Sequence, residues 1–115
     1  MMTVTPRTQT RQQGADGPRT IEPIDGLDEL VAAFATLETP DEIRRFLRDL
    51  CTLAELEALS HRWQIARLLD EGKLSYLEIA QEVGGSTATV TRVAQWLRAG
   101  AGGYRAALER TRTHT

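Results

Sequence analysis

The segment from Ser86 to Gln95, STATVTRVAQ, carries small and polar side chains at the spacing of one helical face. Residues at i, i+3, i+4 and i+7 share one side of a helix. We call the residues on this side the recognition face: Ala88, Thr91, Arg92 and Gln95. Small side chains approach base edges closely, Thr and Gln can donate and accept hydrogen bonds, and Arg can contact guanine in a bidentate manner. The pattern indicates a surface that reads double-stranded DNA.

Two short helices hinged at Gly84-Gly85 would hold the recognition face in place, which predicts a helix-turn-helix over residues 75–98. Ser75 and Glu78 form a capping box at the start of the first helix, and Ser86 caps the second. Four apolar residues supply the contacts of the first helix: Leu77, Ile79, Ala80 and Val83. Four more mark the buried side of the second: Val90, Val93, Ala94 and Leu97. The alternative is an αα-hairpin that only packs within a helical bundle.

Further helices precede and follow this unit, so we predict an all-α fold of about six helices. A stripe of leucine, valine and phenylalanine predicts a helix over 25–37. Thr39 then caps a second helix with Pro40 at its first position, and a Thr52–Glu55 capping box opens a third helix that ends near Gly72. A short last helix follows the glycine-rich break at 100–103. The predicted organisation is a disordered tail over 1–22, a folded domain over 23–110 and a frayed end over 111–115.

The third helix is apolar around most of its circumference. Leu53, Leu56, Leu59, Trp63 and Ala66 mark one side, and Ala58, Ile65, Leu68 and Leu69 lie on others. A helix of this kind must be buried on several sides, and a second copy of the chain could supply that cover. The pattern favours an intertwined homodimer, and the alternative is a central helix buried within a monomer.

The formal net charge of −2 does not favour a nucleic-acid partner. The acidic side chains, however, gather away from the predicted helix-turn-helix. Residues 21–59 carry ten acidic and three basic side chains, whereas residues 60–98 carry four acidic and five basic ones. We therefore expect DNA affinity that is modest and strongly dependent on salt.

The remaining composition points to a cytoplasmic protein without a metal or cofactor. Cys51 is the single cysteine, which excludes an intramolecular disulfide, and His61 and His114 lie far apart, so no metal site is expected. No apolar run reaches membrane-spanning length, and no signal peptide is evident. Neighbouring carboxylates such as Glu55 and Glu57 are typical of solvated helix faces, so an enzyme is not expected.

Long sequence motifs resemble the Trp repressor superfamily, and most closely the Trp-repressor-like proteins of the YerC/YecD type. The similar stretch is LSYLEIAQEVGGSTATVTRV, preceded by RWQIARLLDEGK and followed by GYRAALER. Its most specific parts are DLCT-x-x-E-x-x-x-L-x-x-R at 49–62 and G-x-S-x-A-T-V-T-R at 84–92. The resemblance implies an all-helical, intertwined homodimer that binds palindromic operators, a geometry for which the Trp repressor is itself the standard example.

Carried over by residue, the resemblance implies DNA contacts by Ser86, Thr87, Ala88, Thr89, Thr91 and Arg92. It departs on the preceding helix, where Leu77 and Ala80 stand in place of basic residues. Fewer phosphate contacts and a different or weaker operator should follow.

The tryptophan pocket of the family is matched only in part. Arg62 and Arg92 occupy the positions of the two arginines that flank the corepressor, but Val93 replaces a glycine and Trp96 replaces a serine. We predict that these bulkier side chains fill the pocket and that tryptophan does not bind. Trp63 and Trp96 could instead be ordinary core residues, and for Trp63 this is the preferred interpretation.

The expected function is a sequence-specific transcriptional regulator, a repressor that acts by occupying its operator. It is expected in the bacterial cytoplasm, associated with the nucleoid through DNA binding. Its expected partners are double-stranded DNA with a palindromic operator and a second copy of the chain, with no membrane, metal or small-molecule effector. The alternative function is a helical protein-interaction module of the transcription machinery that does not bind specific DNA. The acidic first two helices favour this alternative.

Overall fold

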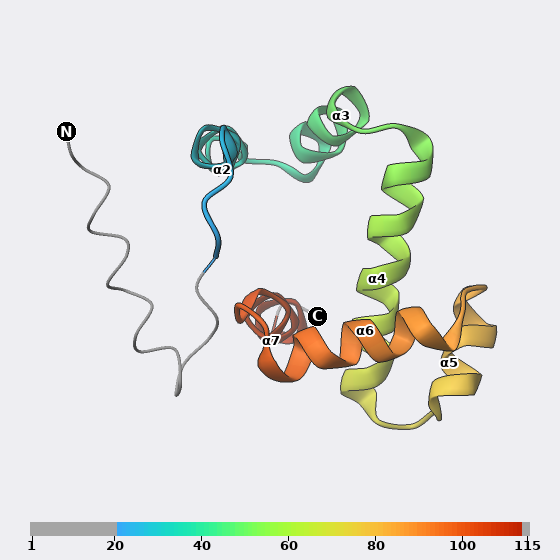
Figure 1. Ribbon diagram of the computed structural model, residues 1–115. Helices are drawn as coiled ribbons and strands as arrows, with labels where there is room; N and C mark the ends of the chain where they lie inside the picture. The colour runs from blue at the N-terminus through green and yellow to red at the C-terminus, as the bar shows by residue number, and fades with distance from the viewer. Residues whose placement is uncertain (1–20, 114–115) are drawn as a thin grey trace. The chain divides into compact units, whose positions relative to one another are not determined.

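The computed structural model describes residues 21–113, and within them six helices and no strand are present (Figure 1). The helices are α2 (Leu27–Ala35), α3 (Pro40–Leu50), α4 (Leu53–Glu71), α5 (Tyr76–Val83), α6 (Thr87–Ala99) and α7 (Gly103–Thr113). The predicted all-α fold of about six helices is confirmed. Within the described range, none of these helices combines the length and apolar composition that a membrane span requires.

Local capping fixes where several helices begin. The Ser75 hydroxyl accepts the Glu78 N–H at 3.1 Å, and the Glu78 carboxylate accepts the Ser75 N–H at 2.8 Å. Thr52 and Glu55 make the same reciprocal pair before α4, at 3.1 and 2.8 Å. Both predicted capping boxes are confirmed, and each satisfies two N–H groups that a helix leaves without partners.

The start of α3 differs slightly from the predicted box. The Thr39 hydroxyl accepts the Glu42 N–H at 3.1 Å as expected, but the Glu42 carboxylate accepts from Glu38 N–H at 2.8 Å, one residue earlier. Pro40 occupies the first helical position, where a missing N–H costs nothing. The cap is therefore reciprocal, but the Glu42 carboxylate accepts from the residue before Thr39 rather than from Thr39 itself.

Two boundaries differ from the predicted ones by a few residues. The first helix was expected over 25–37, but Gly26 adopts a left-handed φ of 83° and the helix begins at Leu27 and ends at Ala35. The frayed end was expected over 111–115, but α7 continues to Thr113. The Thr111 hydroxyl donates to the Ala107 carbonyl at 2.9 Å, and Arg112 forms an ion pair with Asp70 of α4. The predicted tail over residues 1–20 lies outside the described residues, as do 114–115.

The chain divides into two compact units, residues 22–61 and the residues from 62 onward. In the first unit the rings of Phe34 and Phe46 meet edge to face, with centroids 4.9 Å apart, which joins α2 to α3. None of its residues is buried, and large apolar side chains remain exposed along it. The most exposed of these are Ile24, Val31, Leu50, Leu53 and Leu59.

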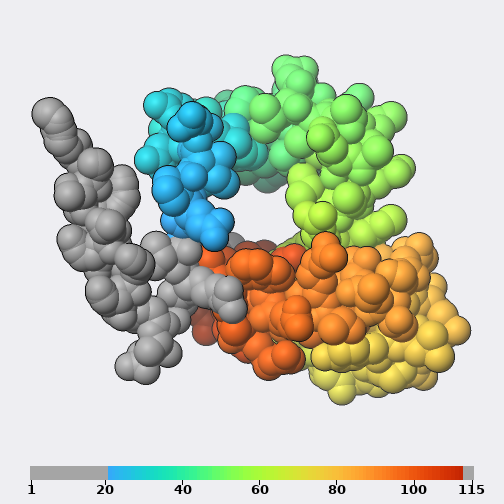
Figure 2. All heavy atoms as spheres, in the orientation of Figure 1, coloured from blue at the N-terminus to red at the C-terminus, as the bar shows by residue number. Residues whose placement is uncertain are grey.

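The second unit contains the hydrophobic core. Its central cluster of buried residues comes from three helices: Ile65 and Ala66 on α4, Ile79 and Ala80 on α5, and Val90 and Val93 on α6. Ala94 on α6 and Leu108 on α7 are also buried. Figure 1 shows α6 crossing the C-terminal part of α4, and Figure 2 shows the atoms of α5 and α6 closely packed against each other. Leu77 was predicted to join this core, but it is 59% exposed. The core thus fixes α5 and α6 as one body against α4.

Gly100 is required where α6 ends. Its N–H donates to the Trp96 carbonyl at 2.9 Å, and a Cβ added at Gly100 would lie 2.4 Å from that oxygen and 2.6 Å from Trp96 Cε3. Because the nearest atom belongs to the backbone, a side-chain rotation cannot relieve the clash.

We expect Gly100→Ala to lower the free energy of unfolding by about 1–3 kcal/mol, the usual range for overpacking. Chemical denaturation followed by tryptophan fluorescence measures this change. Gly103→Ala is the matched control, because no atom lies within 4 Å of its added Cβ and it opens α7. Equal stabilities of the two variants would contradict the steric argument.

Candidate nucleic-acid interface

The turn between α5 and α6 is held by backbone and side-chain hydrogen bonds. Gly84 adopts a left-handed φ of 83°, and the N–H groups of Gly84 and Gly85 both donate to the Ala80 carbonyl at 2.9 Å. Glycine is favoured at this position because a Cβ is strained at positive φ. Ser86 follows in extended conformation, and its hydroxyl accepts the Thr89 N–H at 3.2 Å. The turn therefore sets the direction in which α6 starts.

The recognition face is exposed along its whole length. Ala88, Thr91, Arg92 and Gln95 are all exposed in the structure. On the opposite side of α6, Val90, Val93 and Ala94 are 5% exposed or less. The helix thus has the two faces predicted from the sequence, and the arginine lies on the open one.

The remaining residues predicted to contact DNA lie at the beginning of α6. Ser86 and Thr87 are exposed, while Thr89 is half-buried and its hydroxyl lies 3.2 Å from that of Ser86. No acidic residue lies in the first turn of α6, and Arg98 lies in its last turn. An N-terminal helix end of this kind carries partial positive charge and N–H groups that suit an anion such as phosphate.

No basic residue lies on the outer side of α5: two of its exposed residues, Tyr76 and Leu77, are largely apolar, and the others are Glu78, Gln81 and Glu82. Leu74, Tyr76 and Leu77 are 36%, 41% and 59% exposed, and Ala80 is buried. Leu77 therefore exposes an apolar side chain at a position where the resemblance implies a basic residue that contacts phosphate. Sequence reasoning placed Leu77 in the core, because the residue type alone does not distinguish the two sides of an eight-residue helix.

The four predicted equivalents of the corepressor pocket lie in different surroundings. Val93 belongs to the hydrophobic core and is 3% exposed, so its bulk is already packed. Trp96 is 49% exposed, and Arg62 and Arg92 are exposed. Trp96 instead borders an apolar hollow of about 390 Å³. The other residues that line this hollow are Trp63, Ala101, Gly103, Tyr104 and Ala107.

This aromatic hollow was not predicted from the sequence. Trp63 and Trp96 were considered separately, and Tyr104 was placed only on a thin apolar helix face. Their convergence depends on how α7 leaves the glycine break after α6. The two tryptophans and the tyrosine lie up to 41 residues apart in the sequence, so no local pattern joins them.

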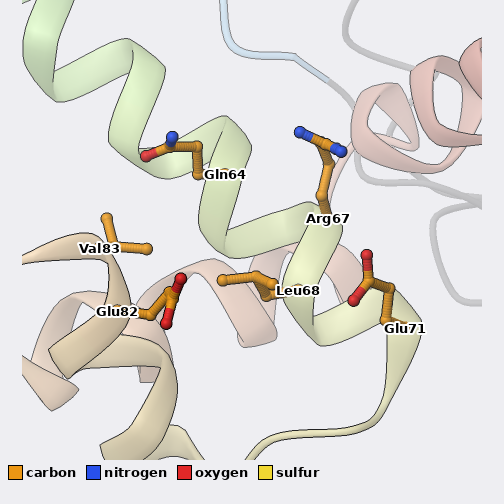
Figure 3. A pocket seen from close by; sticks show the side chains of 6 residues that line it. All are labelled: Gln64, Arg67, Leu68, Glu71, Glu82 and Val83. Atoms are coloured by element: carbon orange, nitrogen blue, oxygen red, sulfur yellow. The ribbon is translucent and has the colours of Figure 1, made fainter.

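A second hollow lies between α4 and α5 (Figure 3). It has a volume of about 170 Å³ and is lined by Gln64, Arg67, Leu68, Glu71, Glu82 and Val83. Its charged lining consists of the carboxylates of Glu71 and Glu82 and the guanidinium of Arg67. Across residues 21–113, no group of histidine, cysteine and carboxylate side chains could hold a metal ion. Neither observation supplies a cofactor site.

The pKa of Tyr104 is shifted by the surroundings of its phenol in the folded protein. Burial raises the pKa of its phenol above 10.0, and the nearby positive charge of Arg62 partly offsets this rise. Since the folded state favours the neutral phenol, the stability contributed by Tyr104 is complete below pH 10 and declines as the pH rises above it.

We therefore expect part of the tyrosinate absorbance to appear late in an alkaline titration of the folded protein. Tyr104→Phe should remove that late component and should flatten the loss of unfolding free energy above pH 10.0. Tyr76→Phe is the control, because it removes the other tyrosine of the chain. A late component that survives in Tyr104→Phe and disappears in Tyr76→Phe would contradict this assignment.

The chain is similar in sequence to a family of known proteins and to individual relatives. Residues 25–112 match the family described as Trp repressor protein. YerC of Bacillus subtilis, an uncharacterised protein, is 41% identical over 86 residues, which cover 75% of this chain and 82% of YerC. A Trp operon repressor homolog of Chlamydia trachomatis serovar D is 39% identical over 64 residues, which cover 52% of this chain and 68% of the homolog.

Two solved structures share the fold. A candidate Trp repressor from Staphylococcus aureus superposes with a TM-score of 0.71 at 40% identity, covering 78% of this chain and 89% of that one. A TrpR-like protein from Eubacterium eligens superposes with a TM-score of 0.70 at 38% identity, covering 76% and 90%. Each similarity includes most of the helices described above.

Proposed function

This chain belongs to the Trp repressor family, and from that premise we propose that it is a sequence-specific DNA-binding regulator of transcription, acting as a repressor by occupancy. The observation that carries the proposal is the exposed recognition face on α6, held by a core on the other side of the same helix. A helix presented in this way can enter the major groove with its N-terminal residues toward base edges. The expected place of action is the chromosome in a bacterial cytoplasm.

In this proposal the recognition face contacts the bases, and the first residues of α6 contact the phosphate backbone. Arg92, with five N–H donors in a fixed fork, suits the O6 and N7 acceptors of a guanine, and Gln95 can both donate and accept. Ser86 and Thr87, at the positive end of α6, suit a backbone phosphate. The outer side of α5 adds no basic residue to this set and carries the exposed carboxylates of Glu78 and Glu82, so the number of phosphate contacts should be small.

We infer that the functional unit is a homodimer. In residues 22–61 no side chain is buried, although Val31, Leu53 and Leu59 are 55%, 63% and 45% exposed. Large apolar side chains left exposed in this number are typical of a protein interface. A second copy with the same surfaces would cover it by two-fold symmetry, and the two α6 helices would then lie about 34–36 Å apart on a palindromic operator.

We propose further that tryptophan is not an effector. Val93 is already packed in the core, and the resemblance to the family implies that Trp96 stands in place of a smaller pocket residue. Titration calorimetry of the purified protein with tryptophan should give no heat of binding at micromolar affinity. A saturable heat that disappears in Arg62→Ala would contradict the proposal and would identify a working corepressor pocket.

A protein-interaction module is the second candidate function. Leu74, Tyr76 and Leu77, exposed at and just before the start of α5, favour it, as does the net charge of −2. Such binding would be apolar and therefore insensitive to salt, in contrast to DNA binding. The salt dependence of the measured interaction therefore separates the two functions.

The deciding experiment is a selection of bound fragments from a genomic DNA library at two salt concentrations. A two-fold symmetric motif that persists at the higher salt would support the dimeric DNA-binding regulator. Recovery of random fragments at low salt alone would show non-specific phosphate binding and would contradict it. The protein-interaction module would then be the remaining candidate.

A further inference from the structure

The hydroxyl of Thr91 is engaged within its own helix. Its Oγ1 lies 3.0 Å from the Thr87 carbonyl oxygen, and because a carbonyl only accepts, the hydroxyl is the donor. Its one proton is therefore not available to a base. The residue is nevertheless exposed, so its methyl group and the lone pairs of its oxygen remain accessible. Thr91 is a weaker polar group for DNA than its residue type indicates.

On the recognition face, the residue one turn before Thr91 is apolar. Ala88, three residues before Thr91, is exposed and offers only a methyl group. The hydroxyls of Ser86 and Thr89 lie 3.2 Å apart, and the Ser86 oxygen also accepts the Thr89 N–H. Because residues three apart are neighbours on a helix surface, the N-terminal half of the recognition face carries the methyl groups of Ala88 and Thr91 on adjacent turns, and the strong donors start at Arg92.

We infer that Ala88 and Thr91 recognise the 5-methyl group of thymine. Among the four base pairs only those with thymine carry a methyl group in the major groove, and the methyl groups of alanine and threonine suit it. The hydrogen bond to Thr87 holds Oγ1 toward its own backbone, and the methyl is the other branch on the same carbon. Each half-site would then contain a thymine toward the N-terminal end of α6, beside the guanine contacted by Arg92. The inference rests on the proposed function and specifies its target.

Uracil tests this inference directly, because it keeps the O4 acceptor and the pairing of thymine but lacks the methyl group. The fragment selection is run on two copies of one randomised duplex library, synthesised with thymine or with deoxyuridine. In the thymine library a motif with a preferred thymine is expected. In the uracil library the same motif should emerge without a preference at that position.

Affinity for the recovered duplex is then measured with thymine or uracil at the preferred position. The wild-type protein should bind the uracil duplex about fourfold more weakly, which corresponds to about 0.8 kcal/mol for one buried methyl-sized group. A uracil placed at an unselected position of the same duplex should change nothing. An equal affinity for the thymine and uracil duplexes would overturn the inference.

Two variants separate the methyl group of Thr91 from its hydroxyl. Thr91→Val keeps a branched side chain with methyl groups and loses the hydroxyl, so it should retain the preference for thymine over uracil. Thr91→Ser keeps the hydroxyl and loses the methyl group, so its preference for thymine should fall toward one. The opposite order would show that the hydroxyl reads the base and would overturn the inference.

The two libraries distinguish an error in this inference from an error in the proposed function. If neither library yields an enriched motif, the proposed DNA-binding function itself is contradicted. If a motif is enriched and bound equally well with thymine and uracil, only the role of Ala88 and Thr91 is wrong. Circular dichroism of both Thr91 variants confirms that α6 is intact, since Thr91 lies outside the hydrophobic core.

Discussion

Arg92→Ala is expected to weaken binding to the selected operator by about 1–3 kcal/mol, which is roughly 5- to 150-fold. Arg92 is exposed on the recognition face and is outside the hydrophobic core. Its removal therefore leaves the helix-turn-helix folded and takes away the guanidinium fork. Competition binding with the selected duplex and with a duplex mutated at the guanine measures the effect.

The specific expectation concerns discrimination as well as affinity. Wild-type protein should prefer the guanine duplex, whereas Arg92→Ala should bind both duplexes with similar affinity. Arg105→Ala is the matched control, since it removes one exposed guanidinium from α7 rather than from α6. If Arg105→Ala and Arg92→Ala weaken both duplexes to the same extent, Arg92 contributes only charge and has no role in reading bases.

The parts of the fold that could be predicted from the sequence depend on local chemistry. The Ser75–Glu78 and Thr52–Glu55 boxes need partners only three residues away, so the sequence contains both halves of each interaction. The division of α6 into two faces follows from a strict apolar spacing around Val90 and Val93. Such signals place a helix correctly without any knowledge of the rest of the molecule.

The features that were missed depend on contacts between distant segments. The ion pair between Arg112 and Asp70 spans 42 residues, and it accompanies the continuation of α7 beyond its expected end. The aromatic hollow likewise joins Trp63, Trp96 and Tyr104 from three helices. Neither feature leaves a periodic signal in the sequence, because each depends on the packing of helices against one another.

The hydrogen bonding of Thr91 on the recognition face could not be predicted from the sequence either. Thr91 was expected to donate and accept hydrogen bonds, since that is the chemistry of a free threonine. In the structure its proton is directed to the Thr87 carbonyl. Sequence alone does not show whether a helical threonine bonds to the preceding turn or faces outward, and the two cases predict different bases.

Val31→Glu is expected to have the other large effect, on assembly. Val31 lies on the apolar stripe of α2 with Leu30 and Phe34 and is 55% exposed in the single chain. If a partner covers this stripe, a carboxylate at this position loses its hydration without gaining a counter-ion, which costs several kcal/mol. We expect the dimer to dissociate at least about a hundredfold more readily, which corresponds to about 2.8 kcal/mol.

Sedimentation equilibrium over a range of protein concentrations measures this change, and operator binding should be lost with the dimer. Ala32→Glu is the matched control. It adds the same charge one residue later, on the side of α2 opposite the apolar stripe, at a residue that is also exposed. An unchanged dissociation constant in Val31→Glu, or an equal effect of Ala32→Glu, would contradict an interface on this stripe. Because two linked half-sites bind far more tightly than one, a monomer that still folds would also show how much of the operator affinity depends on pairing two recognition faces.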